Sequence, residues 1–176
     1  ASMGRHFRLL LLSATCILRQ ARCSFQWTNG NSQNLVLGAS SVAVSDDGSV
    51  AYAAAADVSS AGSVYKSTDY GVTWSSLAAS CASASEVACS SDGTSVVATV
   101  YEGLVYVSAD SGASWSSKDP GGAGSPGYYG YAAVSSNGSV MAVTSYGNIF
   151  VSRDAGASWS AGDSPQTAWT GLAISE

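Results

Sequence analysis

The chain has few charged residues, a single histidine and only three prolines. Charged residues are 11% of its 176 residues, whereas disordered chains combine high net charge with low hydrophobicity, so disorder is excluded. Leu, Glu and Lys are too rare for a helical bundle. The composition is instead rich in Ser, Ala and Gly, with five Trp and nine Tyr. Together with frequent Val, the aromatic residues favour β-sheet.

Residues 1–23 have the composition of a secretory signal. Basic residues from Arg5 to Arg8 precede an apolar run that extends to Leu18, and small side chains fit cleavage after Cys23. The apolar run is too short to span a bilayer, which takes about 20 residues. The alternative is a buried N-terminal helix, but no helical stripe of apolar residues is visible. We therefore expect a secreted or lumenal protein with no membrane span once the signal is removed.

Removal of residues 1–23 would leave a strongly acidic chain. It takes away the only histidine and four arginines, so three basic residues remain against twelve acids and the net charge changes from −5 to −9. An acidic surface repels phosphate groups, so nucleic acid is not an expected partner. A serine hydrolase is not expected, because the residues beyond 23 contain neither a histidine nor a Gly-x-Ser-x-Gly motif. No cofactor is expected.

Two of the four cysteines lie within the predicted signal. The remaining pair, Cys81 and Cys89, is predicted to form a disulfide, because an even pair in a secreted chain indicates oxidation. The alternative is two buried thiols. A zinc site is not expected, since two thiols without a histidine cannot complete a tetrahedral shell.

An internal repeat organises the rest of the chain. The octapeptide Ser-x-Asp-x-Gly-x-x-Trp occurs three times, and its tryptophans are spaced by 41 and 44 residues. A second motif, a serine-containing turn that ends in Asp-Gly or Asn-Gly at Gly48, Gly93 and Gly138, recurs every 45 residues. Two independent motifs with one period indicate repeated structural units.

The segments between these motifs have the composition of short β-strands. Apolar runs flank each Asp-Gly or Asn-Gly turn, which is a strong hairpin signal, and both central positions of such a turn are expected to have positive φ. A third apolar run precedes each octapeptide, and the tryptophan opens a fourth. Four short antiparallel strands per repeat predict an all-β fold, a β-propeller of four-stranded blades.

The octapeptide closely resembles the Asp box, or BNR repeat, of sialidases, sortilin-type receptors, xyloglucan-hydrolysing enzymes and photosystem II assembly factors. The resemblance covers residues 40–176 and implies that each motif closes the hairpin between the third and fourth strands of a blade. Asp would accept turn N–H groups, Gly would supply a φ that other residues avoid, and Trp would cover the turn. This assigns structural roles to Ser67, Asp69, Gly71, Trp74, Ser108, Asp110, Gly112, Trp115, Ser152, Asp154, Gly156 and Trp159.

The repeats divide the chain into three blades and the beginning of a fourth. The blades are expected at 40–80, 81–124 and 125–167, and residues 168–176 match the opening strand of a further blade. Since propellers usually have four to eight blades, the fold is predicted to be C-terminally incomplete, with about three and a half blades. Residues 24–39 contain a strand-like segment that could close the ring as an outer strand.

Glycoside hydrolysis is an alternative that the residues support poorly. A sialidase needs an arginine triad, and Arg153 is the only arginine outside the predicted signal. A xyloglucan hydrolase needs two opposed carboxylates, and nothing around the acids outside the motifs marks a catalytic pair. No catalytic residue is predicted; those acids are Asp57, Glu86, Glu102, Asp119, Asp163 and Glu176.

Binding chemistry fits the sequence better. The propeller face opposite the Asp boxes carries the longer connections, where tyrosines occur among glycines and acids, and such side chains suit sugar stacking or protein contact. The alternative is that several of these tyrosines pack between blades. The candidate binding residues are Tyr101, Glu102, Tyr128, Tyr129, Tyr146 and Asp163.

The sequence therefore predicts a secreted or lumenal, non-catalytic propeller that binds a protein or a glycan. Two alternatives stay open. One is a fragment of a glycoside hydrolase whose catalytic residues lie mostly outside this chain. The other is a structural extracellular component that self-associates through open strand edges. Asn137-Gly138-Ser139 is a glycosylation sequon whose tight turn could hinder transfer, so its occupancy stays open.

Overall fold

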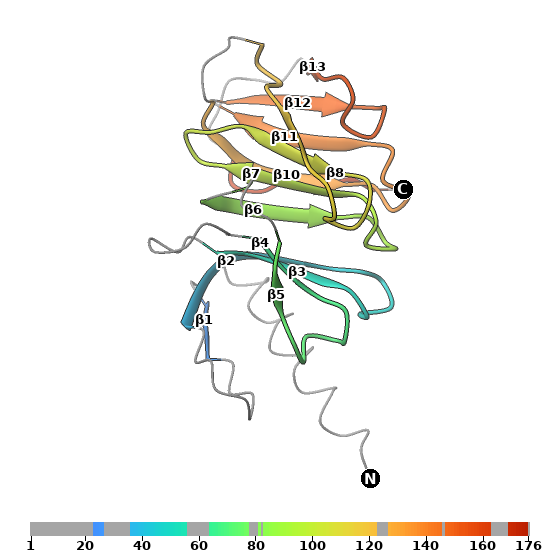
Figure 1. The fold of residues 1–176 in the computed structure, drawn as a ribbon. Helices are drawn as coiled ribbons and strands as arrows, with labels where there is room; N and C mark the ends of the chain where they lie inside the picture. The colour runs from blue at the N-terminus through green and yellow to red at the C-terminus, as the bar shows by residue number, and fades with distance from the viewer. Residues whose placement is uncertain are drawn as a thin grey trace.

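Three antiparallel β-sheets lie side by side in the computed structural model of the chain (Figure 1). The structure describes residues 23–26, 36–55, 64–77, 81, 83–122, 127–145, 147–162 and 169–175. Every regular element among them is a β-strand. No helix in the described part of the chain is long and apolar enough to cross a membrane. The architecture is all-β, as predicted; the signal predicted at residues 1–23 lies almost wholly outside the described residues and stays a prediction.

Each sheet corresponds to one sequence repeat, and its strands follow one another in sequence order. The first sheet contains β1 (Cys23–Gln26), β2 (Val36–Val44), β3 (Ala51–Ala55), β4 (Val64–Ser67) and β5 (Ser75–Ser76). The second contains β6 (Ala84–Cys89), β7 (Val96–Val100), β8 (Val105–Ser108) and β9 (Ser116–Lys118). The third contains β10 (Tyr129–Val134), β11 (Met141–Ser145), β12 (Asn148–Ser152) and β13 (Ser160–Ala161). The predicted four-stranded antiparallel blades are confirmed.

The first and last described segments lie outside the three four-stranded units. β1 pairs with β2, with Cys23 opposite Ala39 and Gln26 opposite Val36, so it is a fifth strand at the sheet edge opposite β5. Residues 169–175 form no strand, although Trp169 Nε1 donates a hydrogen bond to the Gly147 carbonyl at 2.8 Å. Ring closure by residues 24–39 stays a prediction.

The Asp-Gly and Asn-Gly turns form the hairpins β2–β3, β6–β7 and β10–β11. In the first, Ser45 N–H donates to the Val50 carbonyl at 2.9 Å, and Gly48 N–H donates to the Ser45 carbonyl at 2.8 Å. The expectation of positive φ at both central positions is wrong, because within these turns only the glycine has it, with φ of 74° at Gly48. The residue before the glycine stabilises the turn with its side chain instead. Asp47 Oδ1 accepts the N–H and the hydroxyl of Ser49 at 2.9 and 2.8 Å.

Each octapeptide turns the chain from the third strand of its blade into the fourth. In the second blade, Asp110 accepts Ser108 Oγ–H, Ser114 N–H and Ser114 Oγ–H at 2.6–2.8 Å. Ser108 Oγ in turn accepts Gly112 N–H, and Trp115 Nε1 donates to the Gly112 carbonyl at 3.0 Å. The same networks surround the other two copies, at Ser67, Asp69, Gly71 and Trp74 and at Ser152, Asp154, Gly156 and Trp159.

The pair of positive φ values that is absent from the Asp-Gly hairpins occurs in these octapeptides. Ser111 and Gly112 have φ of 56° and 84°, and the equivalent pairs are Tyr70-Gly71 and Ala155-Gly156. The second position of each pair has the larger φ and is glycine in all three copies, because glycine adopts positive φ without a steric penalty.

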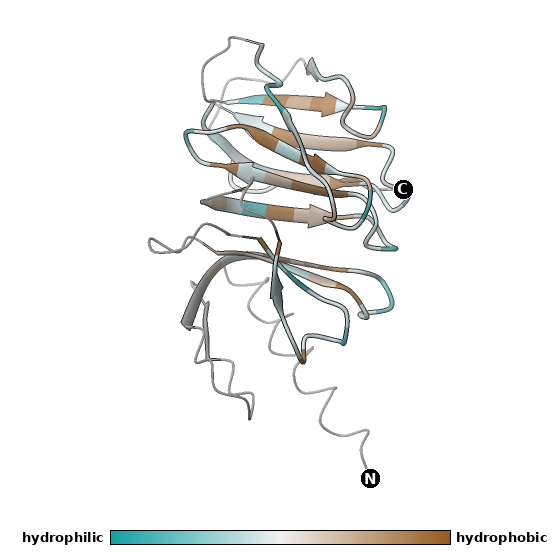
Figure 2. Ribbon diagram, in the orientation of Figure 1, coloured by the Kyte–Doolittle hydropathy of each residue, from teal (hydrophilic) through white to brown (hydrophobic). Residues whose placement is uncertain are grey.

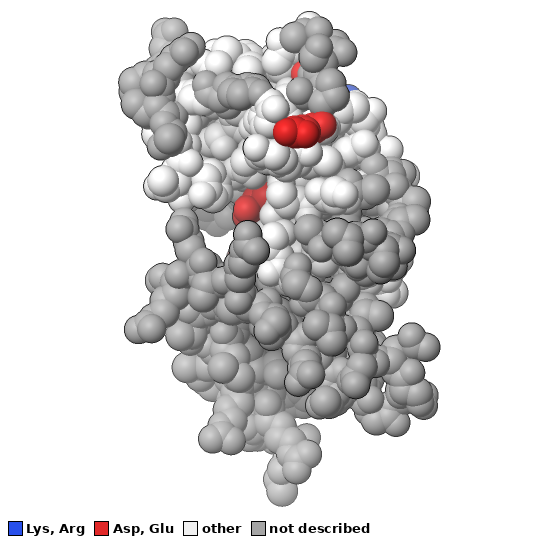
Figure 3. Space-filling view, turned by 90° about the vertical axis from the view of Figure 1, so that its left-hand side faces the viewer, with Lys and Arg blue, Asp and Glu red and all other residues white. Residues whose placement is uncertain are grey.

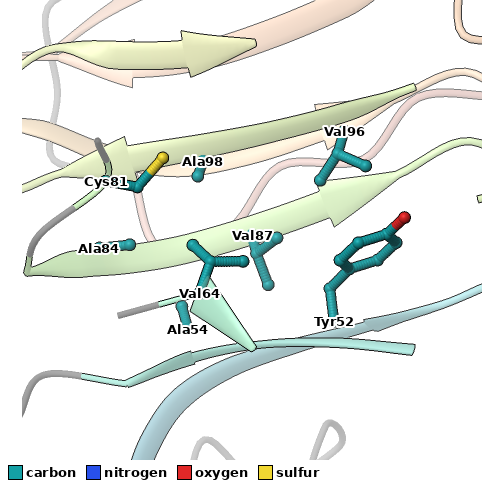
Figure 4. Close-up of a cluster of buried hydrophobic side chains, with 8 residues drawn as sticks. All are labelled: Tyr52, Ala54, Val64, Cys81, Ala84, Val87, Val96 and Ala98. Carbon is teal, nitrogen blue, oxygen red and sulfur yellow. The ribbon is translucent and has the colours of Figure 1, made fainter. Parts of the chain in front are cut away.

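Neighbouring blades pack through small apolar side chains. The buried cluster between the first and second blades is shown in Figure 4 and consists of Tyr52, Ala54, Val64, Cys81, Ala84, Val87, Val96 and Ala98. A second cluster joins the second and third blades through Val97, Val105, Val107, Tyr129, Ala132, Met141 and Val143. The octapeptide tryptophans extend these cores, since Trp115 packs against the first cluster and Trp159 against the second.

Polar contacts reinforce the first of these two interfaces. Tyr52 Oη donates to the Gly93 carbonyl at 2.7 Å, and Lys66 Nζ donates to the Ser111 carbonyl at 2.8 Å. The Lys66 ammonium also lies 5.8 Å from the centre of the Tyr52 ring, a cation–π distance. Tyr52 and Lys66 of the first blade thus form hydrogen bonds with the Asp-Gly turn and the octapeptide of the second blade, respectively.

Backbone hydrogen bonds also run from turn to turn across the blades. Asp46 N–H donates to the Ser91 carbonyl at 2.8 Å, and Ser91 N–H donates to the Ser136 carbonyl at 2.9 Å. Within the second blade, Ser111 N–H of the octapeptide donates to the Thr94 carbonyl of the Asp-Gly turn at 2.8 Å. Both kinds of turn thus share one face, at the right in Figure 1, and Figure 2 shows polar residues in these turns and apolar residues in the strands.

Cys81 and Cys89 are not joined by a disulfide, so that prediction is wrong. Cys81 precedes β6 and Cys89 is the last residue of that strand; a strand rises about 3.3 Å per residue, whereas a disulfide needs Cα atoms within about 7 Å. Cys81 belongs to the buried cluster between the first two blades, and Cys89 packs against it. Burial raises the pKa of both thiols to about 12.

The turn hydrogen bonds hold several aspartates in their ionised form. The hydroxyl and N–H of Ser114 lower the pKa of Asp110 to about 2, and those of Ser158 do the same for Asp154. The same kind of hydrogen bonding lowers the pKa of three further turn aspartates, Asp47, Asp69 and Asp92.

Gly48 and Gly138 occupy equivalent turn positions but differ in the space available for a side chain. Gly48 and Gly138 both have φ of 74°, but an added Cβ would meet Tyr70 Cδ1 at 3.8 Å in the first case and Ser95 Cβ at 2.6 Å in the second. Gly138→Ala is therefore expected to destabilise the protein by about 1–3 kcal/mol more than Gly48→Ala. Urea unfolding of both variants measures the difference, and equal losses would contradict close packing of this turn against the second blade.

The lowered pKa values predict acid sensitivity. Because the pKa of Asp110 and Asp154 is lower in the folded state than the ordinary 3.8, both stabilise the fold above pH 3.8, and this stabilisation is lost as the pH falls through about 2. The melting temperature of the parent should fall over this range. Replacement of both residues by Asn should lower it at pH 7 and flatten its fall in acid. An unchanged slope in the double variant would show that these carboxylates are not the groups involved.

Candidate functional site

The face opposite the turns carries the connection between β7 and β8 and the entry into the third blade, at the left in Figure 1. Gly103 N–H donates to the Val100 carbonyl at 3.1 Å, and Val100 N–H donates to the Leu104 carbonyl at 3.2 Å, which closes the hairpin tightly. Gly127 N–H then donates to the Gly103 carbonyl at 3.0 Å. The hairpin tip of the second blade is therefore fastened to the entry of the third.

Three of the six predicted binding residues meet at this tip. The rings of Tyr101 and Tyr128 lie edge to face, with centroids 5.1 Å apart and an interplanar angle of 76°. Tyr101 is 61% exposed, and Glu102 beside it is exposed with a φ of 55°. Glycine permits the close backbone approach, because a Cβ on Gly103 would lie 2.6 Å from Val100 Cβ.

Tyr129 is not part of this surface, which corrects its prediction as a binding residue. Its side chain is only 1% exposed and belongs to the core between the second and third blades. Its hydroxyl donates to Asp119 Oδ1 at 2.9 Å and accepts Gly121 N–H at 3.1 Å, and burial raises its pKa to about 12. The other two candidates, Tyr146 and Asp163, lie outside the described residues.

The described part of this face carries few charges. Figure 3 shows acidic groups set singly among uncharged side chains, with basic atoms only at the margin of the view. Of the acids near the tip, Asp119 is engaged by the Tyr129 hydroxyl, whereas Glu102 is exposed. In the described part of the chain, no group of three His, Cys, Asp or Glu residues could hold a metal ion.

Glu86 is the acid that the sequence did not single out and that the structure distinguishes. It lies on β6, opposite Thr99 of β7, and its Oε1 accepts a hydrogen bond from Ser41 of β2 at 2.7 Å. Burial raises its pKa, although the Ser41 hydrogen bond acts in the opposite direction. The 45-residue period gave a signal for it, because the equivalent positions are the uncharged Ser41 and Tyr131. An acid at one of three equivalent strand positions is an exception within the repeat.

The raised pKa predicts that the Glu86 carboxylate reduces stability at neutral pH. The folded state holds this proton more tightly than the unfolded chain, so its stabilising effect is complete below the ordinary pKa of 4.5 and is lost as the pH rises through the folded-state pKa. Glu86→Gln should raise the melting temperature at pH 7 by a few degrees, and the difference should vanish below pH 4.5. Glu102→Gln, at an exposed position, is the control that should change nothing at pH 7. A lower melting temperature for Glu86→Gln would mean that the ionised form is needed.

No family model and no curated protein sequence matches the chain. Solved structures do resemble it. The GH74 xyloglucanase from Xanthomonas campestris shares 19% identity at a TM-score of 0.57, over 86% of this chain and 27% of that one. YCF48 from Cyanidioschyzon merolae shares 20% identity at a TM-score of 0.54, over 69% and 35% of the two chains. A chain of the nidogen/laminin complex shares 14% identity at a TM-score of 0.57, over 74% and 49%.

At these identities the likeness concerns the fold alone. The chain spans between about a quarter and about half the length of these three structures, as the coverage of 27%, 35% and 49% shows. The three stacked blades and these neighbours together establish a β-propeller fold, present here as part of a ring.

Proposed function

We propose that the chain is a non-catalytic, Asp-box-type propeller segment that binds a protein through the face opposite its turns. The observation that carries this proposal is the exposed Tyr101 ring, packed edge to face on the half-buried Tyr128, with the exposed Glu102 next in sequence. Exposed aromatic residues are enriched at protein interfaces, where they contribute a large contact area at a low cost in side-chain entropy.

The backbone around this pair favours binding, because it is already ordered. The Gly103–Gly127 bridge and the hairpin bonds between Val100 and Leu104 fix both segments that carry the tyrosines. A preorganised surface loses less conformational entropy when a partner binds. On the opposite face, by contrast, the octapeptide aspartates accept hydrogen bonds from their own turns. The tip is therefore the better candidate for an interface.

The resemblance to a chain of the nidogen/laminin complex supports a protein partner over a glycan, since that chain belongs to a complex of proteins. The resemblance to a GH74 xyloglucanase, together with the raised pKa of Glu86, supports glycoside hydrolysis as a second candidate. Glu86 nevertheless lies between two blades in a hydrogen bond with Ser41, an arrangement suited to structure as much as to proton transfer. Self-association through strand edges stays a prediction.

Selection from a random peptide library displayed on phage tests the proposal. Peptides enriched on the parent protein should bind Tyr101→Ala and Tyr128→Ala at least about tenfold more weakly, because a truncated central aromatic residue removes most of an interface contact. The matched control is Tyr70→Ala, since Tyr70 is 53% exposed but belongs to an octapeptide on the opposite face. Its binding should be unchanged.

Two results would contradict the proposal. One is a library in which no enriched peptide depends on Tyr101 or Tyr128. The other is release of oligosaccharides from xyloglucan by the purified chain that Glu86→Gln abolishes, which would favour the hydrolase.

A further inference from the structure

Tyr101, Glu102 and Tyr128 form an aromatic and anionic surface, which we call the tip site. Its carboxylate is available, because among the described residues no hydrogen bond or ion pair engages Glu102. The edge-to-face contact leaves Tyr101 61% exposed, whereas Tyr128 is half-buried. The tip site therefore offers a ligand an exposed ring and an exposed carboxylate on consecutive residues.

One of the three basic residues beyond residue 23 lies at the same end of the second blade as the tip site, and the other two do not. Of the three basic residues beyond residue 23, Lys66 is bonded to the Ser111 carbonyl and Arg153 lies in an octapeptide on the opposite face. Lys118 ends β9 and pairs with Val105, the first residue of β8, so it lies at the same end of the second blade as the tip site. The acids outnumber the basic residues by twelve to seven over the whole chain. Such an excess of negative charge speeds the association of a cationic partner and complements its charge at the interface.

We infer that the tip site recognises an arginine side chain of the partner protein, an inference that rests on the proposed function. A guanidinium can stack on an aromatic face and still direct its N–H donors to a carboxylate. An ammonium is compact and more strongly hydrated, so lysine would gain less from the same surface. The open ring of Tyr101 supplies the stacking surface, and the neighbouring Glu102 supplies the acceptor.

A neutral sugar is the main competitor for a surface of this kind. It would stack on Tyr101 as well, but its binding would depend little on the charge of Glu102 or on salt. Dependence on charge therefore separates the two ligands.

The probe is the peptide Gly-Ser-Arg-Gly-Ser, titrated into the full chain with its tyrosine rings labelled for NMR. Two matched peptides carry lysine or citrulline in place of arginine, and citrulline keeps the shape of the side chain without its charge. The arginine peptide should bind about fivefold more tightly than the citrulline peptide and shift the ring signals of Tyr101 and Tyr128. Glu102→Gln should remove most of this difference, as should an increase in NaCl from about 50 to about 500 mM. Tyr70→Ala should leave it unchanged.

The inference is overturned if the citrulline peptide binds as tightly as the arginine peptide, or if Glu102→Gln leaves the preference intact. Binding of xyloglucan oligosaccharides that depends on Tyr101 but not on Glu102 would also overturn it. Library peptides that lack arginine but require Tyr101 would leave the proposed protein-binding function standing while this inference fails. Absence of any Tyr101-dependent peptide would remove both.

Discussion

The structure depends on the close approach of neighbouring blades at their Asp-Gly and Asn-Gly turns. Backbone groups of successive turns hydrogen-bond directly to each other, from Asp46 to Ser91 and from Ser91 to Ser136. A backbone contact between blades leaves no room for side chains at that height, so Gly93 and Gly138 face Val50 and Ser95 at distances that a Cβ would crowd. This constraint also explains the composition, because interfaces of this width are filled by Ala and Val, and by few large aliphatic residues.

The same constraint separates the two faces of the propeller. On the turn face, the Ser and Asp side chains complete the hydrogen bonds of the backbone. Their oxygen atoms are therefore engaged within their own turns. On the opposite face, connections such as the β7–β8 tip are closed by glycine and backbone bonds alone. The side chains of Tyr101 and Glu102 are left to face solvent there. The molecule therefore has one face of hydrogen-bonded turn side chains and one face of exposed side chains, because the backbone hydrogen bonds are completed differently on the two faces.

Much of the fold was predictable from the sequence, because its two motifs act through local hydrogen bonds that spacing alone reveals. The errors concern features set by neighbours that are distant in sequence. The predicted disulfide was wrong, since the spacing of Cys81 and Cys89 does not show that Cys81 precedes an extended strand and Cys89 ends it. Tyr128 and Tyr129 are adjacent in sequence, and the sequence does not show that Tyr129 is the one that packs in the core between the second and third blades. The burial of Glu86 depends on packing against another blade.

The turn-to-turn hydrogen bonds have a direction. At each step the N–H belongs to the earlier blade and the carbonyl to the later one, as Asp46–Ser91 and Ser91–Ser136 show. A stack built in this way is polar along its axis, like a filament with unlike ends. Two copies that met through identical ends would set donor against donor or acceptor against acceptor. A further blade can extend the stack by the same contact, whether it arises by gene duplication or belongs to another molecule. Every added blade must then join in the same orientation, so the stack grows in one direction.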